Sequence, residues 1–298
     1  MNSKFYNNFK TAMFFGMMTA LILGIGSFFG QQGVIIALVV AAFSNVIGYF
    51  FSDKIAIAAM GAQEVGPEHE LYQIVEPLAK RANLPMPKVY VSPQMAPNAF
   101  ATGRNHKHAA VCATAGLLQM LDRNEVAGVM AHELAHVKHR DILLQSVAAT
   151  VGGAISVLGY MAMFGGMGGN RNDERGGGGN PLIGLLILIL GPIAAGLIQA
   201  AISRSREFNA DTAGGEICGN PMWLATALEK IHVGAQRVPM DVNPSFNSMM
   251  IAEPRNVMES MAKLFATHPP LEERLSNLIG KESTGIVGGQ RFASPMWR

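Results

Sequence analysis

Two histidines and a glutamate in the segment HELAH have the types and spacing of a metal-hydrolase site. His132 and His136 are four residues apart, so a helix places both imidazoles on one face, where they can bind one metal ion. Glu133 follows the first histidine and can take a proton from a metal-bound water. The alternative is an exposed helix with two histidines that serve no metal. We interpret the pattern as typical of zinc hydrolases.

A catalytic zinc ion needs a third protein ligand and one position open to water. Glu207 and Asp211 are four residues apart, so a helix would bring their carboxylates to one face. Glu207 could bind the metal, while Asp211 could accept an N–H from a ligand histidine and fix its tautomer. A solvated Glu207 paired with Arg204 explains the same spacing equally well. Cys112, in an apolar strand, and Cys218, in a glycine-flanked turn, are poorer candidates.

Two helices are expected to carry these residues. Asp122 and Glu125 resemble a capping box, which predicts a helix over 124–140 that includes the HELAH motif. A second helical stretch is expected over 203–234. It would begin directly after a long apolar segment and carry Glu207 near its start.

The rest of the predicted water-facing domain is a small α+β lobe. Apolar residues at helical spacing predict a helix over 67–83, although Pro77 interrupts the pattern. The stretch over 235–262 is rich in Pro, Asn and Met without a period, and we expect a surface loop. Alternating or apolar runs between polar turns predict three short strands, at 88–92, 98–103 and 109–113.

Composition places this domain next to a membrane. The chain is 49% hydrophobic and 15% charged, well below the roughly 25% charged residues of soluble domains. No Asp, Glu, Lys or Arg occurs in 11–52, 142–170 or 176–203. Such segregation of charge is typical of a membrane protein with a water-facing domain.

The uncharged segments contain four apolar stretches, each near the roughly twenty residues that cross a bilayer. The first two are separated only by Gln31 and Gln32, so a tight hairpin is expected. Pro192 predicts a kink in the fourth. The first stretch is longer than a usual signal core and is interpreted as an uncleaved anchor. The four predicted transmembrane helices are 11–30, 33–51, 142–164 and 181–202.

An alternative stays open for the second pair of stretches, which could be a buried helical hairpin in a soluble domain. Gln145 and Gln199 weaken the membrane interpretation slightly. Between the pair, residues 165–180 include eight glycines and predict a flexible linker outside the cytoplasm.

Basic residues beside the four stretches predict the orientation. In a four-span arrangement only Arg171 and Arg175 lie on one side, so the other side, with the N-terminus and the catalytic segments, is cytoplasmic. Two cysteines are too few for a disulfide scaffold, which agrees with a cytosolic domain. The net charge of +2 does not bear on nucleic-acid binding, but the sequence has no glycine-rich phosphate loop or basic arm, and no nucleic-acid partner is predicted. The basic residues predicted on the cytoplasmic side are Lys4, Lys10, Lys54, Lys138, Arg140, Arg204 and Arg206.

These observations predict a mainly α membrane protein in four parts. The two halves of a cytoplasmic α+β domain flank a second pair of membrane helices. The parts are an N-terminal hairpin at 1–52, a first catalytic part at 53–141, the second pair with its glycine-rich loop at 142–202, and a second catalytic part at 203–298.

Four motifs in order give the chain a specific resemblance that covers nearly its whole length. They are PNAFATG at 97–103, HELAHVKHRD at 132–141, SREFNAD at 205–211 and THPPLEER at 267–274. Together with the four-span layout, they resemble the HtpX-type membrane zinc endopeptidases, which are relatives of the CAAX prenyl endopeptidases. The resemblance implies a gluzincin-like metalloprotease domain that binds one Zn²⁺ per chain.

The resemblance also assigns residues. It implies that Glu207 joins His132 and His136 as the third zinc ligand, and that Asp211 lies behind a ligand histidine. Glu133 would be the general base.

Further assignments concern the substrate. The resemblance implies that Asn98 lies on the edge strand that aligns the substrate backbone, and that His268 and Arg274 help to hold the tetrahedral intermediate. Without the resemblance, the residues alone favour His268 as a helix-entry residue before Pro269 and Pro270.

The expected function is proteolytic quality control in the bacterial inner membrane. Substrates would be misfolded membrane or cytoplasmic proteins, bound as extended strands, and cooperation with other quality-control proteases is expected. An intramembrane protease is disfavoured by the charged residues around the motif helix. A metal transporter or sensor would use the same ligands but would not need Glu133.

Overall fold

The computed structural model describes residues 30–147, 204–235 and 269–280, together with individual residues between 9 and 27. Four predictions therefore lie outside the described residues, one of them except for its first residue. They are the glycine-rich linker at 165–180, the fourth membrane helix at 181–202, the surface loop at 235–262, of which only residue 235 is described, and the placement of His268.

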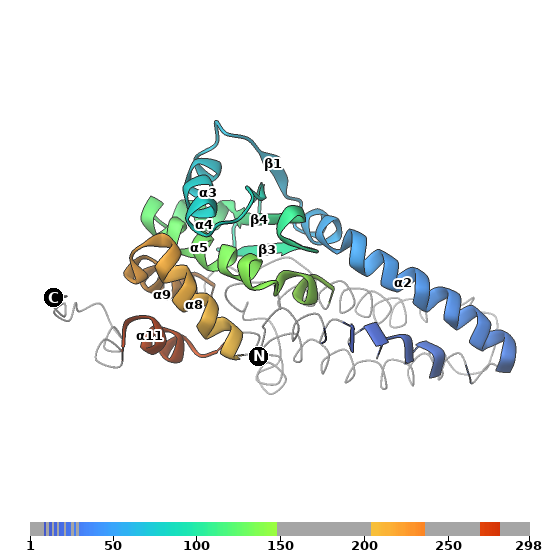
Figure 1. Ribbon diagram of the computed structural model, residues 1–298. Helices are drawn as coiled ribbons and strands as arrows, with labels where there is room; N and C mark the ends of the chain where they lie inside the picture. Colours follow the sequence, from blue (N-terminus) through green and yellow to red (C-terminus); the bar gives the residue numbers. More distant parts are fainter. Residues whose placement is uncertain are drawn as a thin grey trace, which may run out of the picture.

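A four-stranded sheet forms the centre of the water-facing domain (Figure 1). Its strands are β1 (Gln63–Val65), β2 (Lys88–Ser92), β3 (Ala99–Gly103) and β4 (Ala109–Thr114), in the order β1-β2-β4-β3. The β2–β4 pair is parallel, and the two outer pairs are antiparallel. Every residue of β4 is buried, in agreement with its apolar sequence and central position. The three predicted strands are confirmed to within a residue, and the short β1 was not predicted.

Two helices cover one face of the sheet. The first is α3 (Glu70–Arg81), whose buried residues recur at helical spacing and which continues through Pro77. The second is α5 (Arg123–His139), which carries the HELAH motif. The predicted capping box begins α5: Asp122 accepts hydrogen bonds from the backbone of residues 124 and 125, and Glu125 accepts one from the Asp122 backbone. The helices predicted over 67–83 and 124–140 are thus confirmed.

The described residues of the second part of the domain form three helices. Two of them, α8 (Arg204–Cys218) and α9 (Pro221–Ala235), pack directly on α5, and the third, α11 (Leu271–Ile279), packs on α8 and α9. The helical stretch predicted over 203–234 is confirmed, and the structure divides it by a short break between α8 and α9. The break follows from Gly219, which has a φ of +86°, and from a proline at the first position of α9. A short helix, α4 (Ala115–Met120), was not predicted.

The long helix α2 (Gly30–Ala59) projects away from the sheet domain (Figure 1). It has 30 residues and is the one helix in the described part of the chain that is long and apolar enough to cross a membrane. It extends the predicted 33–51 stretch by more than two turns, through Asp53 and Lys54. Large apolar side chains are exposed around it, with Ile36 at 64% and Phe43 at 66%. Such exposure is expected for a helix surrounded by lipid.

Two sets of contacts fix α2 in the molecule. Near the middle of the helix, Asn45 donates a hydrogen bond of 2.9 Å from Nδ2 to the Thr19 hydroxyl, which joins α2 to the first predicted membrane stretch. At its C-terminal end, Ala56 and Met60 pack with Phe100 and Cys112. These last two residues point to the face of the sheet opposite α5.

Only the beginning of the third predicted membrane stretch is described. Residues 142–147 are helical, and most of them are buried. The Ser146 hydroxyl lies 2.7 Å from the Thr102 hydroxyl and 3.4 Å from the Gly103 backbone nitrogen, so this segment contacts the end of β3.

Candidate metal centre

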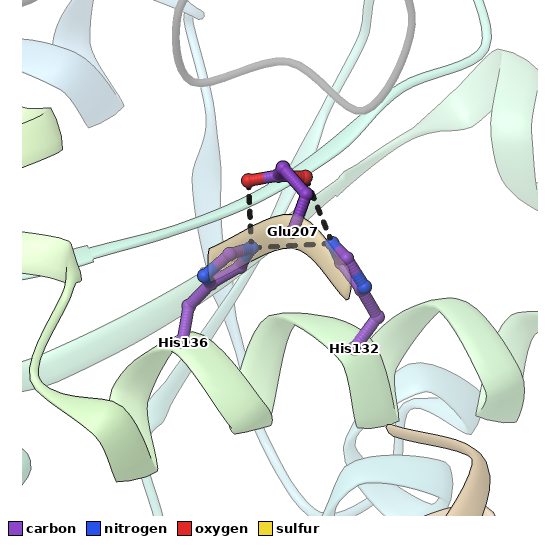
Figure 2. Close-up of side chains that lie close together, drawn as sticks. All are labelled: His132, His136 and Glu207. Atoms are coloured by element: carbon purple, nitrogen blue, oxygen red, sulfur yellow. Dashed lines mark hydrogen bonds and ion pairs between the residues drawn. The ribbon is translucent and has the colours of Figure 1, made fainter. Parts of the chain in front are cut away.

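Three buried side chains from α5 and α8 converge on one point (Figure 2). His132 and His136 project from one face of α5, with their Nε2 atoms 3.2 Å apart. Glu207, in the first turn of α8, places one carboxylate oxygen 3.7 Å from His132 Nε2 and the other 3.6 Å from His136 Nε2. The spacing of four residues therefore does bring both imidazoles together, and Glu207 faces them. The alternative in which Glu207 is solvated is wrong, because its side chain is 2% exposed.

These distances fit a tetrahedral metal ion. Ligand bonds of about 2.0–2.1 Å in tetrahedral geometry separate two donor atoms by about 3.3 Å. The three observed separations lie between 3.2 and 3.7 Å. Two imidazole nitrogens and one carboxylate are also a donor set that suits zinc and leaves a fourth position for water. The residues present therefore fit a catalytic metal ion.

A carboxylate and a guanidinium lie behind His132. Asp211 Oδ1 is 2.9 Å from His132 Nδ1, so the ring can donate there while Nε2 faces the metal position. Arg274 binds both oxygens of the same carboxylate, at 2.6 and 2.9 Å. Burial raises the pKa of Asp211, but the charge and hydrogen bonds of Arg274 outweigh it and hold the pKa below its usual range. Asp211 is therefore ionised and can orient His132.

A second carboxylate, which the sequence analysis missed, lies behind His136. Asp141 Oδ2 is 3.5 Å from His136 Nδ1 and is buried. Arg140 ends α5 in the left-handed conformation, with a φ of 64°, and this turn brings Asp141 back toward the helix. The other oxygen of Asp141 lies 4.0 Å from Arg206. The signal in the sequence was an aspartate five residues after the second ligand histidine, inside the HELAHVKHRD motif.

The electrostatics of the two histidines differ. Burial lowers the pKa of His132 to about 4, against the opposing effect of Asp211. Burial also acts to lower the pKa of His136, but the Glu207 charge, with help from Asp141 and Glu133, raises it to about 9. Because a metal ion binds an unprotonated imidazole nitrogen, protons would compete with the metal at His136.

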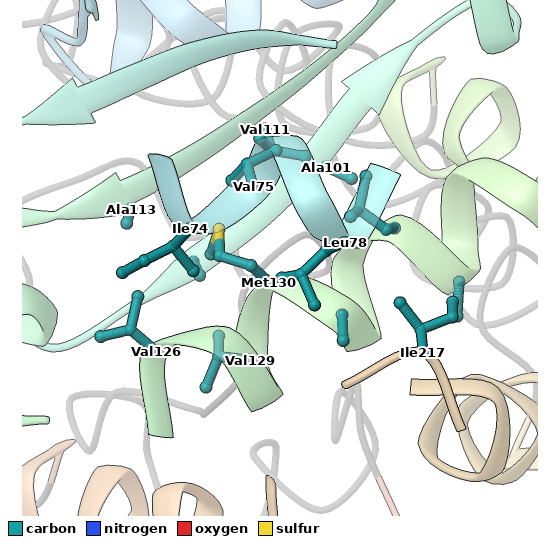
Figure 3. Close-up of a cluster of buried hydrophobic side chains, with 14 of the residues drawn as sticks. Ile74, Val75, Leu78, Ala101, Val111, Ala113, Val126, Val129, Met130 and Ile217 are labelled. Carbon is teal, nitrogen blue, oxygen red and sulfur yellow. The ribbon is translucent and has the colours of Figure 1, made fainter. Parts of the chain in front are cut away.

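The core of the domain holds α5 in place (Figure 3). Val126, Val129 and Met130 on α5 belong to one buried cluster with α3 and the sheet. On the other side, α8 approaches α5 closely at Gly214. A Cβ atom at this position would lie 2.9 Å from His132 Cα, so only glycine permits this approach. Gly214 thereby sets the separation between the helix with two ligands and the helix with the third.

The remaining predicted site residues have mixed outcomes. Asn98 lies directly before β3, which is an edge strand, and its backbone pairs with Thr114. Every residue of β3 is buried, however. Arg274 lies behind His132, with Nη2 3.5 Å from His132 Nδ1, and its other two contacts are the hydrogen bonds to Asp211. The substrate roles of Asn98 and Arg274 stay predictions.

Glu133 lies between the two ligand histidines in sequence and is 5% exposed. Its charge contributes to the raised pKa of both His136 and Arg274, so its carboxylate acts on the same site. A buried carboxylate beside a metal position is suited to take a proton from water.

Comparison with known proteins decides which kind of metal site this is. The family model described as "Peptidase family M48" matches residues 66–282, which include the three candidate ligands, Asp211 and Arg274. The chain belongs to peptidase family M48. It is therefore a metalloprotease, and a transporter or sensor is excluded as its principal class.

Relatives in the same family match almost the whole chain. The protease HtpX homolog of Desulfatibacillum aliphaticivorans is 49% identical over 293 residues, covering 95% of this chain and 93% of that protein. The homolog from Methylibium petroleiphilum is 50% identical over 280 residues, covering 92% and 97%. Among solved structures, the Ste24p of S. mikatae is similar with a TM-score of 0.49 and 19% identity, covering 88% of this chain and 62% of that one.

Proposed function

We propose that this M48 peptidase is a zinc-dependent endopeptidase anchored in the bacterial inner membrane by four helices, with its catalytic domain in the cytoplasm. Its substrates would be misfolded membrane or cytoplasmic proteins. The observation that carries the chemistry is the cluster of His132, His136 and Glu207, with donor atoms 3.2 to 3.7 Å apart. The choice of zinc rests on the two imidazoles and one carboxylate.

Each residue then has a task. A bound zinc ion supplies a Lewis acid and lowers the pKa of water toward neutrality. Glu133 takes the proton of the attacking water and passes it to the leaving amine. Asp211 holds His132 in the tautomer that presents Nε2, and Asp141 acts in the same way on His136. Because the Arg274 guanidinium donates hydrogen bonds from Nε and Nη2 to both oxygens of Asp211, we assign Arg274 the role of holding this carboxylate in place. His268 is then the candidate donor to the oxyanion.

Substrate recognition would use the edge of the sheet. An extended peptide that pairs with β3 would be read through its backbone, which suits a protease that accepts many unfolded sequences. Because every residue of β3 is buried, a peptide could pair with this strand only if a segment that contacts it moved away. The segment that includes Ser146 is one of these, since the Ser146 hydroxyl contacts Thr102 of β3.

The membrane part of the proposal is supported by α2. Its exposed apolar side chains would be costly in water over a surface this large. The uncharged stretches at 142–170 and 176–203 support a second pair of spans, and the basic residues beside the stretches support the cytoplasmic orientation.

Replacement of Glu133 tests the function most directly. Glu133→Gln keeps the three ligands and removes proton transfer, so casein cleavage by the purified full chain should fall at least about a hundredfold. Zinc measured by elemental analysis should stay near one per chain. The exposed Glu216, also on the site's helix α8, provides a matched Glu216→Gln control with unchanged cleavage. Substantial cleavage by pure Glu133→Gln protein would refute the proposed role.

A further inference from the structure

A cavity of about 700 Å³ lies where the end of α2 meets the sheet. Ile57 and Ala58 of α2 form one side, and Tyr90 and Ala110 of the sheet form another. Tyr90 packs with the cluster that α2 contributes to, whereas the neighbouring Val89 and Val111 belong to the core around α5. The cavity is therefore on the opposite face of the sheet from the metal centre. Its volume is within the roughly 300–1,000 Å³ of small-molecule sites.

Cations dominate the lining of this cavity. Lys54, Lys88, Arg104 and Lys107 line it, against one carboxylate, Asp53. Lys88 is already paired, with its Nζ 2.8 Å from Glu64. In the described part of the chain, the other three basic side chains form no ion pair with a carboxylate. The cavity thus keeps a net positive charge that a bound anion could neutralise.

Two of these cations are held against aromatic rings. Lys54 Nζ lies 5.2 Å from the centre of the Phe51 ring, and the Arg104 guanidinium lies 5.3 Å from that of Phe50. These contacts place two positive groups beside an apolar wall. Arg104 comes from the loop after β3, so its contact with Phe50 joins the sheet to α2.

The position along α2 relates this cavity to the membrane surface. Phe50 and Phe51 are 47% and 45% exposed and end the apolar surface of α2. No charged residue occurs from 11 to 52, and Asp53 and Lys54 are the first charges after that stretch. The cavity therefore begins at the level where hydrocarbon gives way to lipid headgroups.

We propose that this cavity binds the headgroup of an anionic phospholipid. The phosphate would lie between Lys54, Arg104 and Lys107, and the start of the acyl chains would lie on Phe50 and Phe51. A positive cavity beside an apolar wall complements a ligand that has a phosphate and a hydrocarbon chain, whereas a free phosphate would leave the wall unused. The proposal rests on membrane anchoring through α2 but not on the peptidase chemistry.

Native mass spectrometry of the full-length, zinc-loaded protein in detergent tests this site. The probes are phosphatidylglycerol, phosphatidylcholine with the same acyl chains, and soluble glycerol phosphate. We expect retained phosphatidylglycerol on the wild type, and about a fivefold weaker affinity in Arg104→Gln, since one cation near a membrane surface has about this effect. Combining this change with Lys54→Gln should weaken binding about twentyfold.

Matched controls remove the same charges elsewhere. Arg123→Gln and Lys80→Gln each remove one exposed cation that is paired on the α3–α5 side of the domain. They should leave phosphatidylglycerol binding unchanged. Zinc content and casein cleavage should stay at wild-type values in all four variants, which separates a failure here from a failure of the proposed function and shows that each variant folds.

Three results would overturn the proposal. Phosphatidylcholine could bind as well as phosphatidylglycerol, or the variant with both cavity substitutions could retain as much lipid as the controls. Glycerol phosphate could bind as tightly as the lipid, and the site would then be one for a soluble phosphate. Binding that is selective for the anionic lipid and lost only in the cavity variants supports it.

Discussion

Asp211 holds Arg274 with two hydrogen bonds, of 2.6 and 2.9 Å, while one of the same carboxylate oxygens lies 2.9 Å from His132. All three side chains are buried. Arg274 lies on α11, so the carboxylate behind His132 is itself fixed by a residue 63 positions further along the chain. The candidate metal centre is therefore built from three segments, although its three candidate ligands come from only two.

Replacing Arg274 should weaken the metal site without removing a ligand. Arg274→Gln leaves Asp211 buried without the charge and the paired hydrogen bonds of the guanidinium. Zinc affinity should therefore fall by about 10- to 100-fold, as for other groups behind a metal ligand. Arg274→Lys should lie between this variant and the wild type, because it keeps the charge but not the paired geometry. Competition with a fluorescent zinc chelator measures these affinities. Glu272→Gln, an exposed change on the same helix, is the control. Wild-type zinc affinity in Arg274→Gln would contradict this role.

Glu207 should matter more than Asp211 for zinc binding. Glu207→Gln replaces the carboxylate by a neutral amide, which is a much weaker metal ligand, so the loss should exceed the roughly 100-fold upper range of changes behind a ligand. Asp211→Asn should fall within that range, since it disturbs only the orientation of His132. The exposed Glu216 provides a nearly silent control on the same helix. If Glu207→Gln binds zinc as tightly as the wild type, the third ligand lies elsewhere, and His139 is the next residue to test.

The local sequence predicted the parts of the site that depend on short spacing. A four-residue spacing on one helix fixes the two histidines, and the capping box at Asp122 fixes where this helix begins. Contacts between segments that are distant in the sequence could not be predicted from local spacing. Nothing in the spacing of Glu207 distinguishes a buried ligand from a solvated carboxylate until α8 packs on α5. The resemblance to a known family, rather than the residues alone, supplied that assignment.

Other features escaped prediction because they arise only on packing. Asp141 reaches His136 through a left-handed turn at Arg140, which side-chain type does not signal. β1 has three residues and forms only by pairing with β2. By contrast, the break between α8 and α9 does not depend on packing and could have been inferred from Gly219 and the proline that begins α9, since both residue types disfavour a continuous helix.

Gly214 should be required for the geometry of the metal site. A methyl group there would meet the backbone of His132 at 2.9 to 3.0 Å, so Gly214→Ala must push α8 away from α5. We expect a loss of about 1–3 kcal/mol in the free energy of unfolding, as for other overpacked positions, and weaker zinc binding because Glu207 moves with α8. Denaturant unfolding of the metal-free and zinc-loaded protein measures both effects.

Gly215→Ala is the neighbouring comparison for this prediction. A Cβ there would meet the Pro221 side chain at 3.1 Å, away from the ligands. It should cost stability but leave zinc affinity near the wild-type value. Equal zinc affinity in the two alanine variants would show that the separation of α5 and α8 at Gly214 does not control the site.

The proposed topology predicts opposite accessibility for two glycine positions in intact cells. A cysteine at Gly178, in the predicted external linker, should react with a membrane-impermeant thiol reagent, whereas one at Gly288 should react only after lysis. The native thiols give little background, because Cys112 and Cys218 are buried and burial raises the pKa of Cys112 to about 12. If the cysteine at Gly178 is shielded in intact cells and reacts after lysis, residues 142–202 form a hairpin on the cytoplasmic side. The protein would then cross the membrane twice, through the segments at 11–30 and 33–51.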